Sequence, residues 1–577
     1  MSIAKIYKFL FATEAKIYAR RSLFWLSLGL VFSLIYSWIG LQKAFNGEYI
    51  VQDDARQHVF WMRRFIDPQL FPHDLIADYY QSIAPWGYKN IYRLVAALGI
   101  DPMVFNKFVP GILGIIMTVY CFAVSLELLP IPFGAFTATL LFNQNTWAQG
   151  GLISGTARNF IYPLFFIFIY YWLRRSLVGV CITLLLASWF YPSLVLICAG
   201  VLFWQLWRVE GYLPRLCKER KIIIFNCIGL AVAFIVLLPY VLSASEYGPT
   251  TTLEQARSLP EFISGGRASF FHDDDPWRFW FNGSRTGIKL APALIPQLAY
   301  GGLLLPILLK FPQKFPLIQK INPKIVYLRD LLIVSFGLFF AAHALLFKLY
   351  LPSRYTSRSL KVVIVLAAAI TLMLILDAVW RWASNSYSQN KLKSIIALTT
   401  LTIFFITLIG YPATRSTFVN TGYHIGQHPE LYQFLQQQPK DTLIASLTPE
   451  ADLIPSFAQR SILVGREYAI PYHMGYYKPF RQRVVDLIKA QYTSNLTTVK
   501  NFIDRYGIDL WLVEQSSFTP EYLEQNRWLS DHLPVTQNAI ENLKQGQVSA
   551  IASLADSCIV FQDAKYKLIS SKCILKQ

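Results

Sequence analysis

The sequence predicts a polytopic α-helical membrane protein with about eleven transmembrane helices, followed by a C-terminal extracytoplasmic α/β domain. Three observations support this fold class. The 577 residues are 54% hydrophobic and only 15% charged, which is typical of membrane proteins. Long apolar runs recur as far as residue 412, and basic residues are concentrated between alternate runs. Beyond Tyr411 the polarity rises, and helix-period and strand-period patterns alternate.

Eleven apolar runs are candidate transmembrane helices, since spanning a bilayer takes about 20 apolar residues. They occupy 22–42, 104–129, 131–149, 159–173, 176–190, 192–207, 222–245, 288–309, 327–347, 359–380 and 393–412. The run 131–149 is interrupted by three consecutive polar residues, and 176–207 forms two helices only if a turn lies at 189–192. The first run lacks a cleavage site, so we expect a retained helix rather than a removed signal peptide.

The charge distribution orients these helices. The tracts assigned to the cytoplasm are the N-terminus, 174–175, 208–221, 310–329 and 381–393. Together they hold twenty Lys and Arg residues and three Asp and Glu residues, whereas 43–103 holds six basic and seven acidic residues. This asymmetry follows the positive-inside rule and predicts a cytoplasmic N-terminus. The net charge of +19 is therefore not interpreted as a nucleic-acid surface, and no nucleic-acid partner is expected.

The chain is expected to divide into two domains. Residues 1–412 form the transmembrane domain, and residues 413–577 form the α/β domain, which is long enough for a sheet core. The predicted orientation places three further segments on the outer side. These are 43–103, a first loop with interfacial helices; 246–289, a second large loop; and the short segment 348–361. A site on this face can draw on all of them.

The predicted α/β domain is built from alternating elements. Helices are predicted at 428–439, 449–459, 475–492 and 496–508, and strands at 441–447, 461–465 and 509–515, with one or two more within 557–569. An extracytoplasmic location would allow a disulfide between Cys558 and Cys573. The other five cysteines show no metal or redox spacing.

The first outer loop opens with VQDDARQH, in which Asp53 and Asp54 are adjacent carboxylates at the predicted membrane surface. An apolar stripe at helical spacing, from Ala55 to Ile66, predicts an interfacial helix that begins near Asp53. One interpretation is that the pair caps this helix, whose dipole favours negative charge. The other is that one carboxylate accepts a proton from a hydroxyl arriving from the water, with Arg56 as countercharge or phosphate ligand. We favour Asp53 as the base, because Asp54 begins the helix.

At this point the sequence resembles a family. A paired acidic motif, Asp53-Asp54 with Arg56 and His58, stands just after the first transmembrane helix and is followed by interfacial helices, many spans and an α/β tail. This arrangement is similar to that of the GT-C glycosyltransferases, which include protein O-mannosyltransferases, lipid A aminoarabinose transferases and oligosaccharyltransferase catalytic subunits. The family commonly has Asp-Glu where this chain has Asp-Asp, which leaves open which of the two carboxylates acts.

The resemblance implies a glycosyltransferase in the bacterial inner membrane, with the α/β domain outside the cytoplasm. It implies a polyprenyl-phosphate sugar as donor, an acceptor that is a glycan, a lipid or a protein, and Asp53 or Asp54 as the base. The alternative is a non-catalytic or transport protein in cell-envelope glycan assembly. The predicted helices contain few ionisable residues, which favours the enzyme over a transporter.

The second outer loop contains the acidic cluster HDDD followed by PWRFWF. His272, Asp273 and Asp275 are candidate ligands for a divalent cation, which prefers oxygen ligands. The alternative is a solvated acidic turn, since consecutive side chains do not all point at one ion. No cofactor other than this cation is implied. The aromatic residues that follow are expected to anchor the loop at the interface or to stack on a sugar.

The third outer segment, KLYLPSRYTSRSLK, is basic on the side where the charge rule predicts few cations. Arg354, Arg358 and Lys361 are candidates for holding a lipid-linked phosphate and stabilising its charge as it leaves, and Tyr355 for hydrogen-bonding the same group. The alternative is attraction to anionic lipid head groups.

In the tail, Glu467, Tyr472 and His473 lie within one turn-rich stretch, GREYAIPYHMGYY. Tyrosines and carboxylates suit carbohydrate hydroxyls, so these three are candidate substrate-binding residues, although the same residue types build ordinary loops. The remaining histidines, His424 among them, are scattered without metal-site spacing, and no role is assigned to them.

Overall fold

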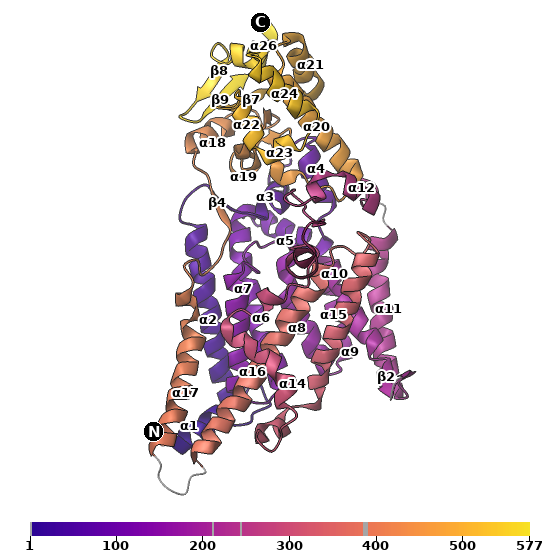
Figure 1. Ribbon diagram of the computed structural model, residues 1–577, viewed down its shortest axis with the longest axis vertical. Helices are drawn as coiled ribbons and strands as arrows, with labels where there is room; N and C mark the ends of the chain where they lie inside the picture. The colour runs from indigo at the N-terminus through magenta and orange to yellow at the C-terminus, as the bar shows by residue number, and fades with distance from the viewer. Residues whose placement is uncertain (1–2, 211–212, 243–244, 385–390) are drawn as a thin grey trace.

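The computed structural model describes residues 3–210, 213–242, 245–384 and 391–577. Residues 211–212, 243–244 and 385–390, which fall in the predicted tracts 208–221 and 381–393 and at the end of the predicted helix 222–245, lie outside the described residues. Long helices run roughly parallel through the lower part of the molecule, and the C-terminal part covers one end of them (Figure 1). The N-terminus lies at the opposite end (Figure 1).

The helices of the lower part follow most of the predicted runs. They are α1 (Ile3–Leu10), α2 (Arg20–Ala44), α6 (Pro102–Leu128), α7 (Pro132–Ala148), α8 (Ile161–Leu173), α9 (Leu177–Phe190), α10 (Pro192–Trp204), α11 (Arg220–Leu242), α15 (Val326–Ala344), α16 (Ser353–Ser384) and α17 (Lys391–Gly410). Among the described residues, six helices are long and apolar enough to cross a membrane, and the chain is a multi-pass membrane protein. The turn predicted at 189–192 is present, because Tyr191 separates α9 from α10. The hairpin β2 (Trp207–Glu210) and β3 (Leu213–Leu216) follows.

The predicted span 288–309 is not one continuous helix, so the prediction was wrong at this position. It consists of α13 (Leu290–Ala293), the 3-10 helix η5 (Gln297–Leu304) and α14 (Leu305–Leu308). The run contains prolines at 292, 296 and 306, and each proline removes a backbone donor and disfavours a continuous α-helix. The short helices still pack against α16, where Gly302 lies against the backbone of Ile364.

Helix α16 begins at Ser353 rather than near residue 359. The third outer segment is therefore helical over most of its length, not the loop that the sequence predicts. Lys361 lies more than two turns into the helix. The cationic residues of this segment therefore lie on one continuous helix rather than on a loop.

The first outer loop folds into short helices. The helix predicted from Asp53 is interrupted, with α3 (Ala55–His58) followed by the 3-10 helix η1 (Phe60–Phe65). Residues Ala55, Val59 and Met62 of the predicted stripe are fully buried, but against protein rather than along the interface. The loop continues with α4 (Leu75–Ser82), capped by Asp74, and with α5 (Trp86–Ala97). The second loop contains α12 (Leu253–Ser258), the 3-10 helix η3 (Pro260–Phe262) and η4 (Arg278–Asn282).

The C-terminal part contains a five-stranded mixed sheet in the order β6-β5-β7-β9-β8. The strands are β5 (Leu443–Ser446), β6 (Ser461–Ile462), β7 (Leu510–Glu514), β8 (Ile559–Gln562) and β9 (Tyr566–Ser570). Pairing is parallel for β6-β5-β7 and antiparallel for β7-β9-β8. The helices are α18 (Pro429–Gln436), α19 (Ile454–Phe457), α20 (Met474–Tyr492), α21 (Leu496–Tyr506), α22 (Pro520–Gln525), α23 (Arg527–Ser530), α24 (Val535–Lys544), α25 (Ala550–Leu554) and α26 (Ser571–Lys576).

A small two-stranded sheet joins the first outer loop to the chain that follows α17. Strand β1 (Ile50–Gln52) pairs antiparallel with β4 (Tyr423–Ile425), with Val51 opposite His424. The ladder continues beyond β1, because the backbone N–H of Asp53 donates to the carbonyl of Gly422 at 3.1 Å. The position of Asp53 is therefore set by a segment that lies about 370 residues later in the chain.

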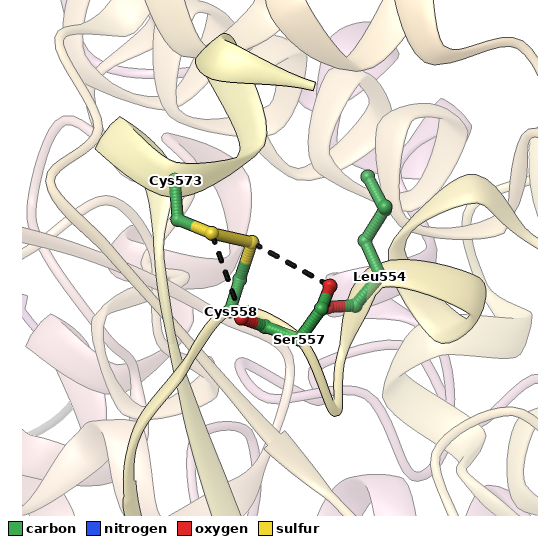
Figure 2. Close-up of a disulfide and its surroundings, with 4 residues drawn as sticks. All are labelled: Leu554, Ser557, Cys558 and Cys573. Carbon is green, nitrogen blue, oxygen red and sulfur yellow. Dashed lines mark hydrogen bonds between the residues drawn. A yellow bond between two sulfur atoms is a disulfide. The ribbon is translucent and has the colours of Figure 1, made fainter.

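The C-terminal part contains a disulfide between Cys558 and Cys573, the pair named from the sequence (Figure 2). It joins the turn before β8 to α26, and the two Cα atoms are 5.5 Å apart. A cross-link of this kind limits the conformations of the unfolded chain.

We expect the double variant Cys558→Ser, Cys573→Ser to lower the free energy of unfolding of this sheet by about 3 kcal/mol, the value typical for a loop of about 15 residues. Hydrogen exchange of the β8 and β9 amides measures the effect. Cys227→Ser, at an exposed free cysteine of α11, is the matched control. Equal protection in both variants would contradict the expectation.

Candidate active site

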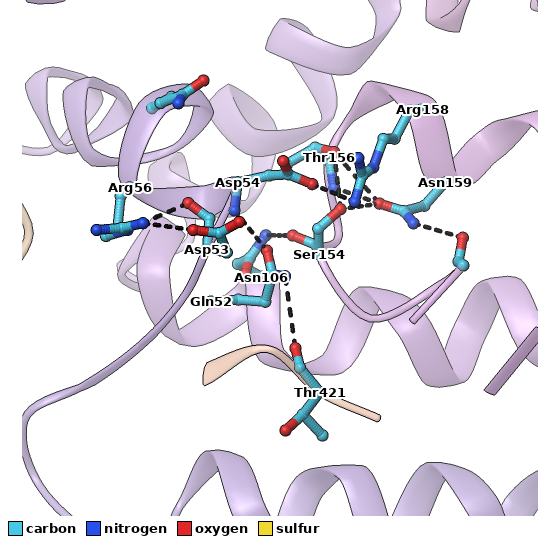
Figure 3. Close-up of polar contacts among 12 residues, drawn as sticks. Gln52, Asp53, Asp54, Arg56, Asn106, Ser154, Thr156, Arg158, Asn159 and Thr421 are labelled. Carbon is cyan, nitrogen blue, oxygen red and sulfur yellow. Dashed lines mark hydrogen bonds and ion pairs between the residues drawn. The ribbon is translucent and has the colours of Figure 1, made fainter. Parts of the chain in front are cut away.

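Asp53 lies directly after β1, at the end of the helices that the C-terminal part covers. Its Oδ1 atom forms an ion pair with the Arg56 guanidinium (Figure 3) and lies 3.1 Å from Nε2 of His424. The hydrogen bond from His424 and the charge of Arg56 hold the pKa of the Asp53 carboxyl well below its usual range, against the opposing effect of burial. Asp53 is therefore ionised at neutral pH, which is the form that a general base needs.

Asp54 occupies the N-cap position of α3, as predicted, but its carboxylate makes no capping hydrogen bond. It forms an ion pair with Arg158 instead (Figure 3). Its backbone N–H donates to the side-chain oxygen of Gln52 at 2.9 Å. The two adjacent carboxylates therefore face different partners, Asp53 toward β4 and Asp54 toward the α7–α8 loop.

The α7–α8 loop, residues 149–160, is held by buried polar contacts (Figure 3). Thr156 and Asn159 form a capping box at the start of the 3-10 helix η2 (Ala157–Phe160). The Asn106 amide of α6 donates to the carbonyl of Ser154 at 2.8 Å. Gly155 has a φ of 61°, and a side chain there would clash with Asn106. These contacts fix the loop that presents Arg158 to Asp54.

A cationic face on α16 consists of Arg354, Arg358 and Lys361, which lie at i, i+4 and i+7 and so on one side of the helix. Arg358 donates to the Tyr191 hydroxyl at 2.7 Å and lies over its ring. Lys361 donates to the side-chain oxygen of Gln149 at 2.9 Å. The Nε atom of Arg354 is buried and has no hydrogen-bond partner in the described chain.

One loop contacts both the carboxylate pair and the cationic face. The first residue of the α7–α8 loop, Gln149, binds Lys361, and its last turn carries the Arg158 that pairs with Asp54. In addition, the Arg354 guanidinium interacts electrostatically with the Asp54 carboxylate. The candidate site therefore combines an ionised acid that is about half exposed with cations in the first turns of α16.

Glu467 connects three of the four predicted outer segments. Its carboxylate contacts Arg267 of the second loop and lies 3.3 Å from Arg56 of the first loop. The Gln57 side chain donates to the Glu467 carbonyl at 2.8 Å. Glu467 was predicted as a substrate-binding residue, and the structure places it in this buried ion cluster beside the site.

The other predicted substrate-binding residues also have protein partners. The Tyr472 hydroxyl accepts a hydrogen bond from Arg285 at 3.0 Å, and Nδ1 of His473 shares one with the Tyr79 hydroxyl at 3.0 Å. Burial lowers the pKa of His473, so its ring is neutral and able to accept. Tyr355 is fully buried and donates to the carbonyl of residue 349 at 2.5 Å.

The predicted metal ligands are not brought together. His272 is buried, whereas Asp273 is exposed and lies 3.2 Å from Arg257. The Asp275 carboxylate accepts the backbone N–H of Arg278 at 2.8 Å. Successive residues of this turn point in different directions, and no group of three or more metal-binding side chains occurs in the described part of the chain.

Sequence reasoning missed three residues of the site, Arg158, Arg267 and His424. Arg158 lies at the start of a predicted apolar span, where a single arginine preceding a long apolar run was the only signal. Arg267 is one of several cations in the second loop, and nothing in the pattern distinguishes it. His424 acquires a partner only through the pairing of β1 with β4, which joins segments too distant to be paired from the sequence.

Several solved structures resemble this chain. The apo oligosaccharyltransferase of Archaeoglobus fulgidus aligns with a TM-score of 0.54 and 12% identity over 90% of this chain and 73% of that chain. The same enzyme with an inhibitory peptide and a dolichol-phosphate aligns with a TM-score of 0.53 and 12% identity, over 90% and 72%. This enzyme is a GT-C membrane glycosyltransferase, and so is the mycobacterial arabinofuranosyltransferase AftD.

The arabinofuranosyltransferase AftD from Mycobacteria aligns with a TM-score of 0.50 and 11% identity over 87% of this chain and 37% of that chain. No protein-family model and no curated protein matches the sequence. The chain has the GT-C fold. The predicted mostly helical, GT-C-like fold is thus confirmed, although six helices of the described residues, rather than about eleven, are long and apolar enough to cross a membrane. The likeness extends over nearly the whole chain.

We expect Glu467→Ala to destabilise the outer segments by about 3 kcal/mol, because it leaves Arg267 without its buried partner. Hydrogen exchange across residues 260–270 reports the change. Asp67→Ala, which removes a more exposed ion pair with Lys440, is the control and should cost less than about 1 kcal/mol. Equal exchange in the two variants would show that the Glu467 cluster does not hold the loops together.

Proposed function

We propose that this chain is a membrane glycosyltransferase that moves a sugar from a polyprenyl-phosphate donor to an acceptor hydroxyl at the outer face of the membrane. The observation that carries the proposal is the meeting of the Asp53-Asp54 pair with the cationic face of α16 across one loop. The fold supports it, since the solved neighbours include an oligosaccharyltransferase studied with a dolichol-phosphate.

The cationic face is suited to the phosphate of the donor. Arg358 and Lys361 are more than nine-tenths buried, and in the part of the chain described none of the three cations pairs with a carboxylate. A buried cation with only neutral partners is costly, and a phosphate or diphosphate would neutralise it. Guanidinium groups bind phosphate oxygens in a bidentate manner. They would also stabilise the charge that develops as the polyprenyl phosphate leaves.

Asp53 is suited to the acceptor side. Its side chain is about half exposed, so a hydroxyl can reach it from water. In the proposed reaction the acceptor oxygen attacks the anomeric carbon, the bond from that carbon to the phosphate oxygen breaks, and its electron pair stays on the phosphate. The acceptor proton passes to Asp53. Asp54 holds Arg158 and thereby orders the loop between the two halves of the site.

The same arrangement gives a location. The excess of basic residues at the opposite end of the helices supports a cytoplasmic N-terminus, which puts the C-terminal part outside the cytoplasm of a bacterial cell. The disulfide supports this placement, because disulfides persist in oxidising compartments. The acceptor is then a glycan, a lipid or a protein of the cell envelope.

The direct test uses the purified full chain in lipid nanodiscs with three synthetic donors: an undecaprenyl-phosphate hexose, an undecaprenyl-phosphate pentose and an undecaprenyl-diphosphate hexose. Release of the free polyprenyl phosphate or diphosphate is measured by mass spectrometry, with water as the acceptor when no other is supplied. Turnover of one donor is expected. Release from none of the three would favour the alternative of a non-catalytic or transport protein.

We expect Asp53→Asn to reduce donor turnover by about 100-fold or more, because general-base contributions are typically 100- to 10,000-fold. Asp54→Asn should cost less, since Asp54 acts through Arg158. Asp67→Asn, in the same loop but paired with Lys440, is the control and should retain the wild-type rate. The base assignment is wrong if Asp53→Asn turns over donor like the control.

We expect Arg354→Ala and Arg358→Ala each to weaken donor binding by about tenfold or more, since a hydrogen bond to a charged group contributes about 1.5–3 kcal/mol. Binding of undecaprenyl phosphate in nanodiscs measures this directly. Arg278→Ala, at an exposed arginine of the second outer loop, is the matched control. Equal affinity of all three variants for undecaprenyl phosphate would show that the arginines of α16 do not bind the donor phosphate.

A further inference from the structure

Strand β4 brings His424 to the site from the chain that follows the last membrane helix. In the β1–β4 pairing His424 lies opposite Val51, and Gln52 lies opposite Tyr423. Asp53 follows Gln52 directly and remains in the ladder through its hydrogen bond to Gly422. The imidazole is therefore held against Asp53 by backbone pairing on both sides of the contact.

The contact leaves one carboxylate oxygen free. Nε2 of His424 lies 3.1 Å from Oδ1 of Asp53, and the Arg56 guanidinium contacts the same oxygen. A carboxylate only accepts hydrogen bonds, so Nε2 carries the proton. Within the described residues no hydrogen bond reaches Oδ2. Two donors thus hold Oδ1 from opposite segments, and Oδ2 is the atom available to an incoming hydroxyl.

We propose that His424 is a positioning residue for Asp53: its imidazole holds Oδ1 so that Oδ2 faces the incoming hydroxyl and accepts its proton. This inference rests on the proposed function. It assigns to the C-terminal part a direct contribution to the reacting group, through a histidine on a short strand.

Both partners also act on the charge of Asp53. The His424 hydrogen bond and the Arg56 charge lower the pKa of the carboxyl, and Arg267, Glu467 and Asp452 lie further out in the same cluster. Asp53 therefore stays ionised while its Oδ1 atom is held.

The pair is also open to the acceptor. The side chains of His424 and Asp53 are 44% and 48% exposed, so a hydroxyl can reach the Asp53 carboxylate from water.

The test compares His424→Gln, His424→Ala and His428→Gln in nanodiscs, with the synthetic donor that the wild-type chain consumes. Glutamine retains an N–H donor, whereas alanine does not. His428 is a matched control, because it also pairs with a carboxylate, Asp563 at 2.8 Å, but away from the site. The turnover number and KM are measured at one pH, and thermal melting checks that each variant is folded.

We expect His428→Gln to keep the wild-type turnover number and His424→Gln to lie within about threefold of it, because glutamine keeps a donor for Oδ1. His424→Ala should lose about tenfold in turnover number with little change in KM. A folded His424→Ala variant with the wild-type turnover number, or a His424→Gln variant as slow as His424→Ala, would overturn the proposal.

The Asp53→Asn variant separates failure of the His424 proposal from failure of the base assignment. If Asp53→Asn is inactive and a folded His424→Ala has the wild-type turnover number, Asp53 is the base and His424 is a structural neighbour only. If Asp53→Asn keeps its activity, the base assignment itself is wrong. If His424→Ala does not fold, His424→Gln decides, and a loss of about tenfold or more in its turnover number would overturn the proposal.

Discussion

The site depends on the antiparallel pairing of β1 with β4. Buried backbone groups are costly when they are unpaired, and this short ladder satisfies those of the residues before Asp53 and after α17. By doing so it fixes the backbone of Asp53 and determines what surrounds its carboxylate. The segments that meet there are separated by nearly the full length of the helical part. The carboxylate pair is thus positioned by the tertiary fold rather than by the local helix that follows it.

The two halves of the site differ in whether their charges are paired. In the candidate site each of three carboxylates has a cation beside it: Asp53 with Arg56, Asp54 with Arg158, and Glu467 with Arg267. On α16 the cations have only neutral partners, a tyrosine hydroxyl and an amide oxygen. A region that is already neutral does not require a charged ligand, whereas a region with uncompensated positive charge does. The asymmetry thus indicates where an anionic ligand would bind.

Much of the architecture could be predicted from the sequence because hydrophobic runs and strand-period segments are local signals. The helices from α6 to α10 and the strands β5, β7, β8 and β9 fall where the patterns place them. The predicted span 288–309 fails because its prolines interrupt an otherwise apolar run, and the outer segment 348–361 fails because α16 extends beyond its apolar part. In both cases the hydrophobicity was judged correctly, but backbone hydrogen bonding decided the result.

The acidic and basic residues of the site could be predicted from the sequence, but the contacts between them could not. Asp53, Arg354 and Arg358 could be chosen because their position in the predicted topology is unusual. Arg158 and His424 acquire their carboxylate partners only when the fold brings distant segments together.

The early start of α16 also links the three cations to the membrane. Because Arg354, Arg358 and Lys361 are attached to one continuous helix, a change in bilayer thickness that tilts this helix moves all three charges together. Lipid composition therefore acts on the alignment of the cationic face with the carboxylates as well as on the surroundings of the protein.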